Sequence, residues 1–232
     1  MLALDQIHRS LMKFSREKHV LNQGFELDAA WWRRELGQAG LDVQPPLGGS
    51  TTTIYLDRQA LFAQASEVFD GTRGPRDFAL HVLLWGSGTT RRNNRRRIDS
   101  LTASTASEVL SEAFEAASRN PSVAFDAFRS RGRNTFPYLG PAYFTKLMYF
   151  AGEGDPDHPS LIVDRRVLMT LSQTELGAGL SAGANYRCET YLRACSVMEE
   201  LAASARRSGE SALSECTPDL VERWAFEQAG LS

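Results

Sequence analysis

The chain has 232 residues, of which 42% are hydrophobic and 23% charged, with a formal net charge of −2. This composition fits one globular domain, or two lobes that share a core, and excludes a uniformly basic nucleic-acid-binding protein. No apolar run is long enough to cross a membrane, and the N-terminal MLALDQIHRSLMKF is too charged for a secretory signal, so we expect a cytoplasmic protein.

The first third of the chain predicts helices joined by loops. Apolar residues recur at helical spacing over 27–39 and again over 55–69. The intervening QPPLGGSTTT, residues 44–53, has the composition of a loop, with a short extended piece near 51–55. No motif identifies this region, so we treat residues 1–75 as an N-terminal extension of uncertain role that packs on the rest.

Apolar helices and a run of arginines make up the middle of the chain. Residues 77–85 predict a buried helix, and RRNNRRR at 91–97 contains five arginines and no acid. An amphipathic helix is expected over 105–118 and a short helix over 121–128. Charge gathered in one segment can give a neutral protein one basic face, although a simply solvated surface remains open as an alternative.

The last third predicts three further helices, over 165–176, 184–207 and 218–228, after a loop at 152–160. The chain as a whole therefore predicts a mainly α protein. Its three cysteines form no CxxC motif and lack a nearby pair of histidines, so we expect neither a disulfide framework nor a metal site.

A sharp turn followed by an apolar helix occupies FPYLGPAYFTKLMYF, residues 136–150. Gly140 can adopt backbone angles closed to other residues, and Pro141 suits the first position of a helix. The free amides and positive dipole end of a helix N-terminus favour a phosphate, and residues 129–150 carry four cations and no acid. The segment thus indicates an anion-binding turn, although Gly-Pro also opens many ordinary helices.

Two ionisable residues beside apolar segments are candidates for chemistry. Lys146 lies at the flank of the apolar stripe of its helix, in line with Ala142 one turn earlier. It is either a boundary lysine whose ammonium reaches water or a group of the site. Asp164 follows an apolar Leu-Ile-Val and precedes two arginines. It is either the N-cap of the next helix or a carboxylate that stabilises a developing positive charge.

These segments, FPYLGPAYFTKLMYF and LIVDRRV, resemble the hairpin and catalytic-aspartate segments of the helix-hairpin-helix DNA glycosylase superfamily. The likeness is closer to its bacterial 8-oxoguanine DNA glycosylase-like branch. Phe136–Gly140 aligns with the Leu-Pro-Gly-hydrophobic-Gly motif of the superfamily. Asp164 aligns with the aspartate of its hydrophobic-Asp-x-x-hydrophobic motif. Gly140 and Asp164 are 24 positions apart, a comparable interval.

Two departures from the family pattern change what the resemblance implies. Tyr138 replaces the first hairpin glycine, which alters the phosphate grip. Ala142 occupies the position where bifunctional 8-oxoguanine enzymes carry their Schiff-base lysine, and Lys146 lies one helical turn further on. From there Lys146 could reach the same pocket or contact an extruded base, so the lysine chemistry does not transfer residue for residue.

The resemblance implies a mainly α, two-lobed helical fold of the helix-hairpin-helix glycosylase type, with an N-terminal extension. It is specific over 136–170, weaker over 77–100 and 184–228, and absent from 1–75. We therefore expect the extension at 1–75 and a glycosylase-like domain at 76–232, with its hairpin at 123–151 and its aspartate segment at 161–170.

The activity implied is that of a DNA N-glycosylase, which flips a damaged or modified base out of duplex DNA and cleaves its N-glycosidic bond. Asp164 would stabilise positive charge on the deoxyribose. A desolvated Lys146 would attack C1′ and add Schiff-base lyase activity, whereas a solvated one would only contact the DNA. The resemblance suggests an 8-oxoguanine-type lesion first as the substrate, and a bulky modified base of foreign (phage) DNA is an alternative.

Further predicted site residues would bind the DNA backbone and the base. The backbone grip is expected from the amides of Leu139, Gly140 and Ala142, together with Arg133, Arg165 and Arg166. The opposite side of the duplex is assigned to Arg91, Arg92, Asn93, Asn94 and Arg95, whose asparagines could read base edges or fill the vacated space. Candidates for stacking on the base, or for the core, are Trp85, Tyr186 and Trp224.

Two non-enzymatic alternatives remain open. A helical reader of modified DNA would bind without releasing a base, and a structural helical protein that binds a partner would lack salt-dependent affinity for DNA. For the enzyme we expect a nucleoid-associated monomer that acts on double-stranded DNA. We expect no cofactor, apart from a structural monovalent cation that the hairpin could hold.

Overall fold

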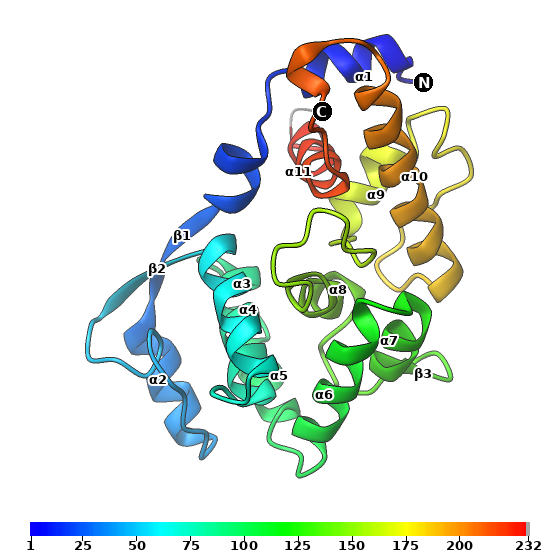
Figure 1. Ribbon diagram of the computed structural model, residues 1–232. Coiled ribbons are helices and arrows are strands. Elements are labelled where there is room, and N and C mark those ends of the chain that lie inside the picture. Colours follow the sequence, from blue (N-terminus) through cyan, green and yellow to red (C-terminus); the bar gives the residue numbers. More distant parts are fainter. Residues whose placement is uncertain (231–232) are drawn as a thin grey trace.

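Helices account for most of the computed structural model, which describes residues 1–230 (Figure 1). The α-helices are α1 (Leu4–Leu11), α2 (Ala29–Gln38), α3 (Arg58–Phe69), α4 (Pro75–Ser87), α5 (Asn94–Ser100), α6 (Ala106–Ala117), α7 (Pro121–Phe128), α8 (Pro141–Phe150), α9 (Arg165–Leu171), α10 (Cys188–Arg206) and α11 (Pro218–Gln228). A π-helical turn covers Arg16–Leu21 and a 3₁₀ turn Ser211–Leu213. Two antiparallel ribbons pair β1 (Gly24–Asp28) with β2 (Thr53–Asp57), and β3 (Arg129–Ser130) with β4 (Arg133–Asn134). The mainly α prediction is confirmed.

The β1–β2 ribbon corrects the first two predicted helices, which begin later than the sequence pattern indicated. The strands pair from Gly24 opposite Asp57 to Asp28 opposite Thr53. In β2, Ile54 and Leu56 are buried while Tyr55 between them is exposed, a period of two that fits a half-buried strand. Overlap with the following apolar helix concealed this short alternation in the sequence.

Each of these strands ends at an aspartate that caps the next helix. Asp28 Oδ1 accepts a hydrogen bond from the Trp31 amide at 3.0 Å, at the start of α2. Asp57 Oδ1 accepts one from the Ala60 amide at 2.8 Å, at the start of α3. The carboxylates satisfy amides that have no partner inside the helix, so both strand-to-helix transitions are fixed by sequence.

The loop between α9 and α10 also differs from the prediction, because α9 ends at Leu171 and α10 begins only at Cys188. Thr174 Oγ1 donates to the Leu171 carbonyl at 2.7 Å and accepts from the Gly177 amide at 3.0 Å. A hydroxyl that bonds to the last helical carbonyls provides an alternative to a further turn. Tyr186 therefore lies in a loop and not within a helix.

From α3 onward the helices form two groups, α3–α8 and α9–α11. The N-terminal segment, residues 1–57, runs across both groups (Figure 1). At one end α1 packs against α11, where Trp224 Nε1 donates to Ser10 Oγ at 2.9 Å. Further along the chain, β1 packs on α4 in the other group. Residues 1–57, which precede α3, are therefore in contact with both groups of helices.

A buried ion pair connects these groups through α3 and α11. Arg58 Nη1 lies 2.8 Å from Glu222 Oε2, and each side chain is 2% exposed. The contact is an ion pair between two charged groups that are both removed from solvent. Arg58 Nε also donates to Gln23 Oε1 at 2.7 Å, and its guanidinium lies 5.1 Å from the centre of the Tyr149 ring. Arg58 thus joins the N-terminal segment, α8 and α11.

We predict that Glu222→Ala destabilises the protein by about 3–5 kcal/mol, because it leaves the Arg58 charge buried without its partner. Urea unfolding at neutral pH measures this change in the free energy of unfolding. The control is Glu200→Ala, which removes an exposed partner of Arg193 and should cost at most about 1 kcal/mol. Equal losses in the two variants would refute a special role for the buried pair.

Candidate functional site

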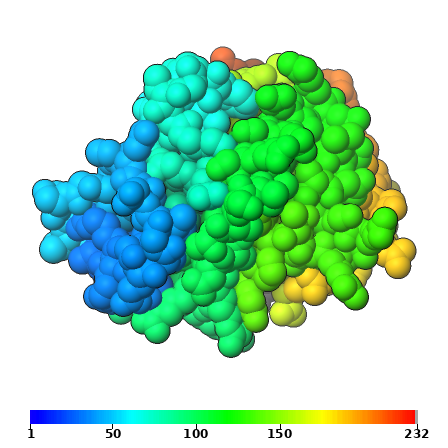
Figure 2. Space-filling model, turned by 90° about the horizontal axis from the view of Figure 1, so that it is seen from below, coloured from blue at the N-terminus to red at the C-terminus, as the bar shows by residue number. Residues whose placement is uncertain are grey.

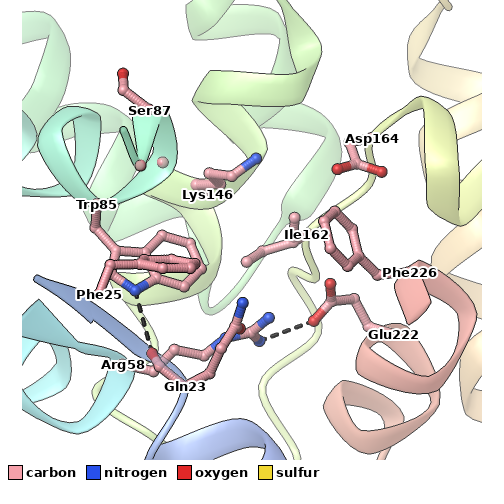
Figure 3. A pocket seen from close by; sticks show the side chains of 12 residues that line it. Gln23, Phe25, Arg58, Trp85, Ser87, Lys146, Ile162, Asp164, Glu222 and Phe226 are labelled. Carbon is pink, nitrogen blue, oxygen red and sulfur yellow. Dashed lines mark hydrogen bonds and ion pairs between the residues drawn. The ribbon is translucent and has the colours of Figure 1, made fainter. Parts of the chain in front are cut away.

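A cavity of about 200 Å³ lies between the two groups of helices (Figure 3). Its walls come from β1, α3, the end of α4, α8, the start of α9 and α11. The lining residues are Gln23, Phe25, Arg58, Trp85, Gly86, Ser87, Gly88, Lys146, Ile162, Asp164, Glu222 and Phe226. Both residues that the sequence analysis proposed as catalytic, Lys146 and Asp164, therefore line the same cavity.

Asp164 caps α9 and faces the cavity at the same time. Its Oδ1 accepts hydrogen bonds from the amides of Arg166 at 2.9 Å and Val167 at 3.0 Å. The preceding apolar residues are buried, and the Val163 carbonyl accepts a bond from the Tyr186 hydroxyl at 2.5 Å. These contacts fix the carboxylate at the edge of the cavity.

Lys146 approaches the cavity from α8. Its Nζ donates to the Ala142 carbonyl at 2.5 Å, and Figure 3 shows the amine pointing to the side on which Asp164 lies. Solvent reaches part of the side chain, but dense protein surrounds the amine. This burial lowers the pKa of the Lys146 ammonium, and the Asp164 carboxylate opposes the shift. A lowered pKa raises the fraction of neutral, nucleophilic amine.

In the turn before α8, Tyr138 has the left-handed backbone conformation that is usual for glycine. Tyr138 has φ 66°, which is uncommon for a residue with a side chain, and Arg97 Nε donates to its carbonyl at 3.1 Å. The Leu139 amide bonds to the Phe136 carbonyl at 3.1 Å and is thus engaged within the turn. In the part of the chain that the structure describes, the Gly140 amide shows no such bond and is better placed for an anion.

The predicted arginine loop is held to the N-terminal segment. Arg91 pairs with Asp28, and Arg95 pairs with Glu35 at 2.5 Å. Figure 2 shows the blue N-terminal segment beside the green middle of the chain on one face, in agreement with these contacts. Asn93 is exposed and begins α5 with φ 62°.

Asn94 does not fit its predicted contact with bases, because it is fully buried. Its amide donates to the Thr90 carbonyl at 2.9 Å, and its Oδ1 accepts from Ser87 at 3.1 Å and Arg97 at 2.7 Å. Asn94 therefore holds the loop in shape. Arg92 is exposed on the same loop.

The remaining predicted cations lie around the turn and α9. Arg133 is exposed on β4, in the short ribbon between α7 and the turn. Arg165 is exposed at the start of α9. The guanidinium of Arg166 lies 4.1 Å from the centre of the Phe226 ring and so supports a cavity residue.

Of the three predicted stacking aromatics, the structure brings only Trp85 to the cavity. Tyr186 supports the segment before Asp164, and Trp224 is buried against Ser10. The aromatic lining that the sequence analysis missed is Phe25 and Phe226. Phe226 stands four residues after Glu222 on α11, a spacing that places both on one helix face and could have indicated a shared site.

In residues 1–230, no group of three or more His, Cys, Asp and Glu side chains is placed to bind a metal ion. Within the same residues, no helix has the length and apolar character needed to cross a membrane.

Comparison with known proteins gives one match. The model of a family described as "Putative 8-oxoguanine DNA glycosylase OGG-like protein" matches residues 18–226. The match begins well before residue 76, so the prediction that the family likeness is absent from 1–75 is wrong. Searches of curated proteins and of solved structures found no match.

We predict that Asp164→Asn lowers the pKa of Lys146 further, because it removes the nearby negative charge that stabilises the ammonium. The sequence contains three lysines, and the other two, Lys13 and Lys18, are exposed. Carbon-13 NMR titration of the reductively methylated protein can therefore follow Lys146 with two internal controls. A Lys146 pKa that rises or stays constant in the variant would contradict the proposed electrostatic contact.

Proposed function

Because the chain belongs to the OGG-like family of 8-oxoguanine DNA glycosylase-like proteins, we propose that it flips a damaged or modified base out of duplex DNA and cleaves its N-glycosidic bond. The observation that carries this proposal is the presence of Asp164 and Lys146 in one cavity, with Lys146 on the helix that follows the turn at Gly140. An enzyme of this kind needs a carboxylate near the sugar and a slot for the base, and Asp164 and the aromatic walls of the cavity are our candidates for these parts.

Asp164 is the proposed stabiliser of the transition state. Positive charge develops on the deoxyribose as the bond to the base breaks, and a fixed carboxylate lowers the energy of that charge. Two main-chain amides hold Oδ1 in place, so little reorganisation is needed during the reaction. Phe25, Trp85 and Phe226 supply apolar surface for the base in the same cavity.

Lys146 is the proposed nucleophile of an additional lyase activity. Its neutral amine would form a bond from Nζ to C1′ while the bond between C1′ and the base breaks and the base leaves with the electron pair. Nζ would then give a proton to the departing base. The nitrogen lone pair would form a double bond to C1′ as the bond between C1′ and the ring oxygen breaks, and the ring oxygen would take a proton from water, which gives a protonated Schiff base. The lowered pKa of Lys146 supports this role because the attacking form is the free amine.

The DNA backbone is proposed to lie along the turn before α8, with α7, the turn and α8 as the helix-hairpin-helix. The Gly140 and Ala142 amides would bind a phosphate, which the dipole of α8 favours, and a structural monovalent cation could sit there. Arg133, Arg165 and Arg92 are exposed and would contact neighbouring phosphates. We propose a monomer that acts on nucleoid DNA in the cytoplasm without another cofactor.

We predict that Asp164→Asn reduces base excision about 10²- to 10⁴-fold, because asparagine cannot supply the negative charge. Asparagine can still cap α9, so stability and duplex binding should remain unchanged. Asp164→Ala should lose the cap as well, at a cost of about 0.5–2 kcal/mol. Single-turnover excision, duplex titration and thermal unfolding measure the three quantities. Excision by the asparagine variant at the parental rate would refute the catalytic role of Asp164, whereas duplex binding without base release by the parent itself would favour a non-catalytic reader.

The substrate and the lyase step can be tested with duplexes that carry 8-oxoguanine, other damaged bases or bulky modified bases. We predict that borohydride traps a covalent complex on the preferred duplex, and that Lys146→Ala abolishes it. Lys13→Ala, at an exposed lysine, is the matched control and should trap normally. Base release that needs alkali for strand cleavage, with no trapped complex, would instead indicate a glycosylase without lyase activity.

A further inference from the structure

Gly86 lies at the penultimate position of α4, where the helix passes the side chain of Lys146. A Cβ atom built on Gly86 would lie 2.9 Å from Lys146 Cδ and 3.4 Å from Lys146 Cε. The first distance is shorter than real Cβ contacts allow, so a side chain at position 86 and the present lysine conformation exclude each other.

The backbone gives no reason for a glycine at position 86. Gly86 is helical and is not among the residues with positive φ, unlike Gly88, which ends the same helix with φ 52°. Glycine inside a helix is less favourable than alanine because it loses more conformational freedom on folding. The clash with Lys146 is therefore the structural reason that we identify for glycine here.

The path of Lys146 depends on this open space. Side chains of a helix point toward its N-terminus, so a lysine at position 146 reaches back along α8. Its stem passes Gly86, and its Nζ arrives at the Ala142 carbonyl, 2.5 Å away and one turn before its own position. The amine is thereby brought level with residue 142.

We propose that Gly86 is a positioning residue for Lys146. The missing side chain leaves a notch in α4 that holds the lysine stem and directs the amine into the cavity. This inference rests on the proposed function, in which Lys146 attacks the sugar. Because the stem is flexible, a methyl group in the notch displaces the lysine and leaves the helix intact.

The test is Gly86→Ala, with Gly37→Ala as the matched control. Gly37 is also helical, in α2, and apart from its chain neighbours and the adjacent backbone of α2 no atom lies within 4 Å of the position of its added Cβ. We expect Gly86→Ala to slow borohydride trapping about 10- to 100-fold at neutral pH, since small displacements of a reacting group carry penalties of this size. The midpoint of the pH profile for trapping should rise as the amine moves toward solvent. The control should match the parent in both.

NMR titration of methylated Lys146 gives a readout that does not depend on activity. In Gly86→Ala its pKa should rise toward the ordinary lysine value, whereas Gly37→Ala should leave it unchanged. An unchanged pKa, or parental trapping with a parental pH profile, overturns the role of Gly86 and leaves the proposed function standing. If the parent itself traps nothing, the lyase proposal fails, and the NMR result alone decides the inference about Gly86.

A double-mutant cycle for stability tests the contact between positions 86 and 146 even if one variant folds poorly. If the notch accommodates the lysine stem, Gly86→Ala should be less favourable for stability in the parent than in a Lys146→Ala background, where the space is free. Equal effects in both backgrounds would show that positions 86 and 146 are independent and would overturn the proposal.

Discussion

The two hydrogen bonds from the start of α9 to Asp164 Oδ1 are the constraint on which the candidate site depends. The carboxylate cannot turn away from the cavity without leaving amides of the helix unsatisfied. The sequence left two interpretations of this residue open, a helix cap and a group of the site, and in the structure the carboxylate that caps α9 also lines the cavity. Because the cap depends on the position of α9, folding of the chain also fixes the position of the Asp164 carboxylate.

The second candidate residue of the site comes from the other group of helices, so the site exists only where the two groups meet. Lys146 belongs to α8, Glu222 and Phe226 belong to α11, and the ion pair with Arg58 holds the groups at this junction. Burial of the pair carries a desolvation cost that a well-packed apolar contact would avoid. What the charged pair adds is further polar surface in a cavity that Phe25, Trp85 and Phe226 line with aromatic rings.

Local sequence patterns predicted the parts of the site that lie on continuous segments. The turn at Gly140, the lysine at the flank of its helix and the aspartate after an apolar run could all be identified from spacing. Gln23, Phe25 and Arg58 could not, because they reach the cavity through packing between segments far apart in the chain, and no periodicity encodes such contacts. For the same reason Tyr186 and Trp224 could not be separated from true cavity aromatics, since burial in a core and burial in a pocket look alike in sequence.

The ion pairs of Arg91 with Asp28 and Arg95 with Glu35 affect how strongly these arginines would bind the phosphates of a duplex. A phosphate that approaches these arginines would have to displace a protein carboxylate, whose negative charge would stay close to the duplex. The arginines would then neutralise the phosphates less completely, so fewer cations condensed on the DNA would be released than the number of arginines suggests. Loss of these ion pairs would also loosen α2 from α5. Because Asp28 ends β1, and Phe25 of β1 lines the cavity, a duplex bound on this side would act on one wall of the cavity.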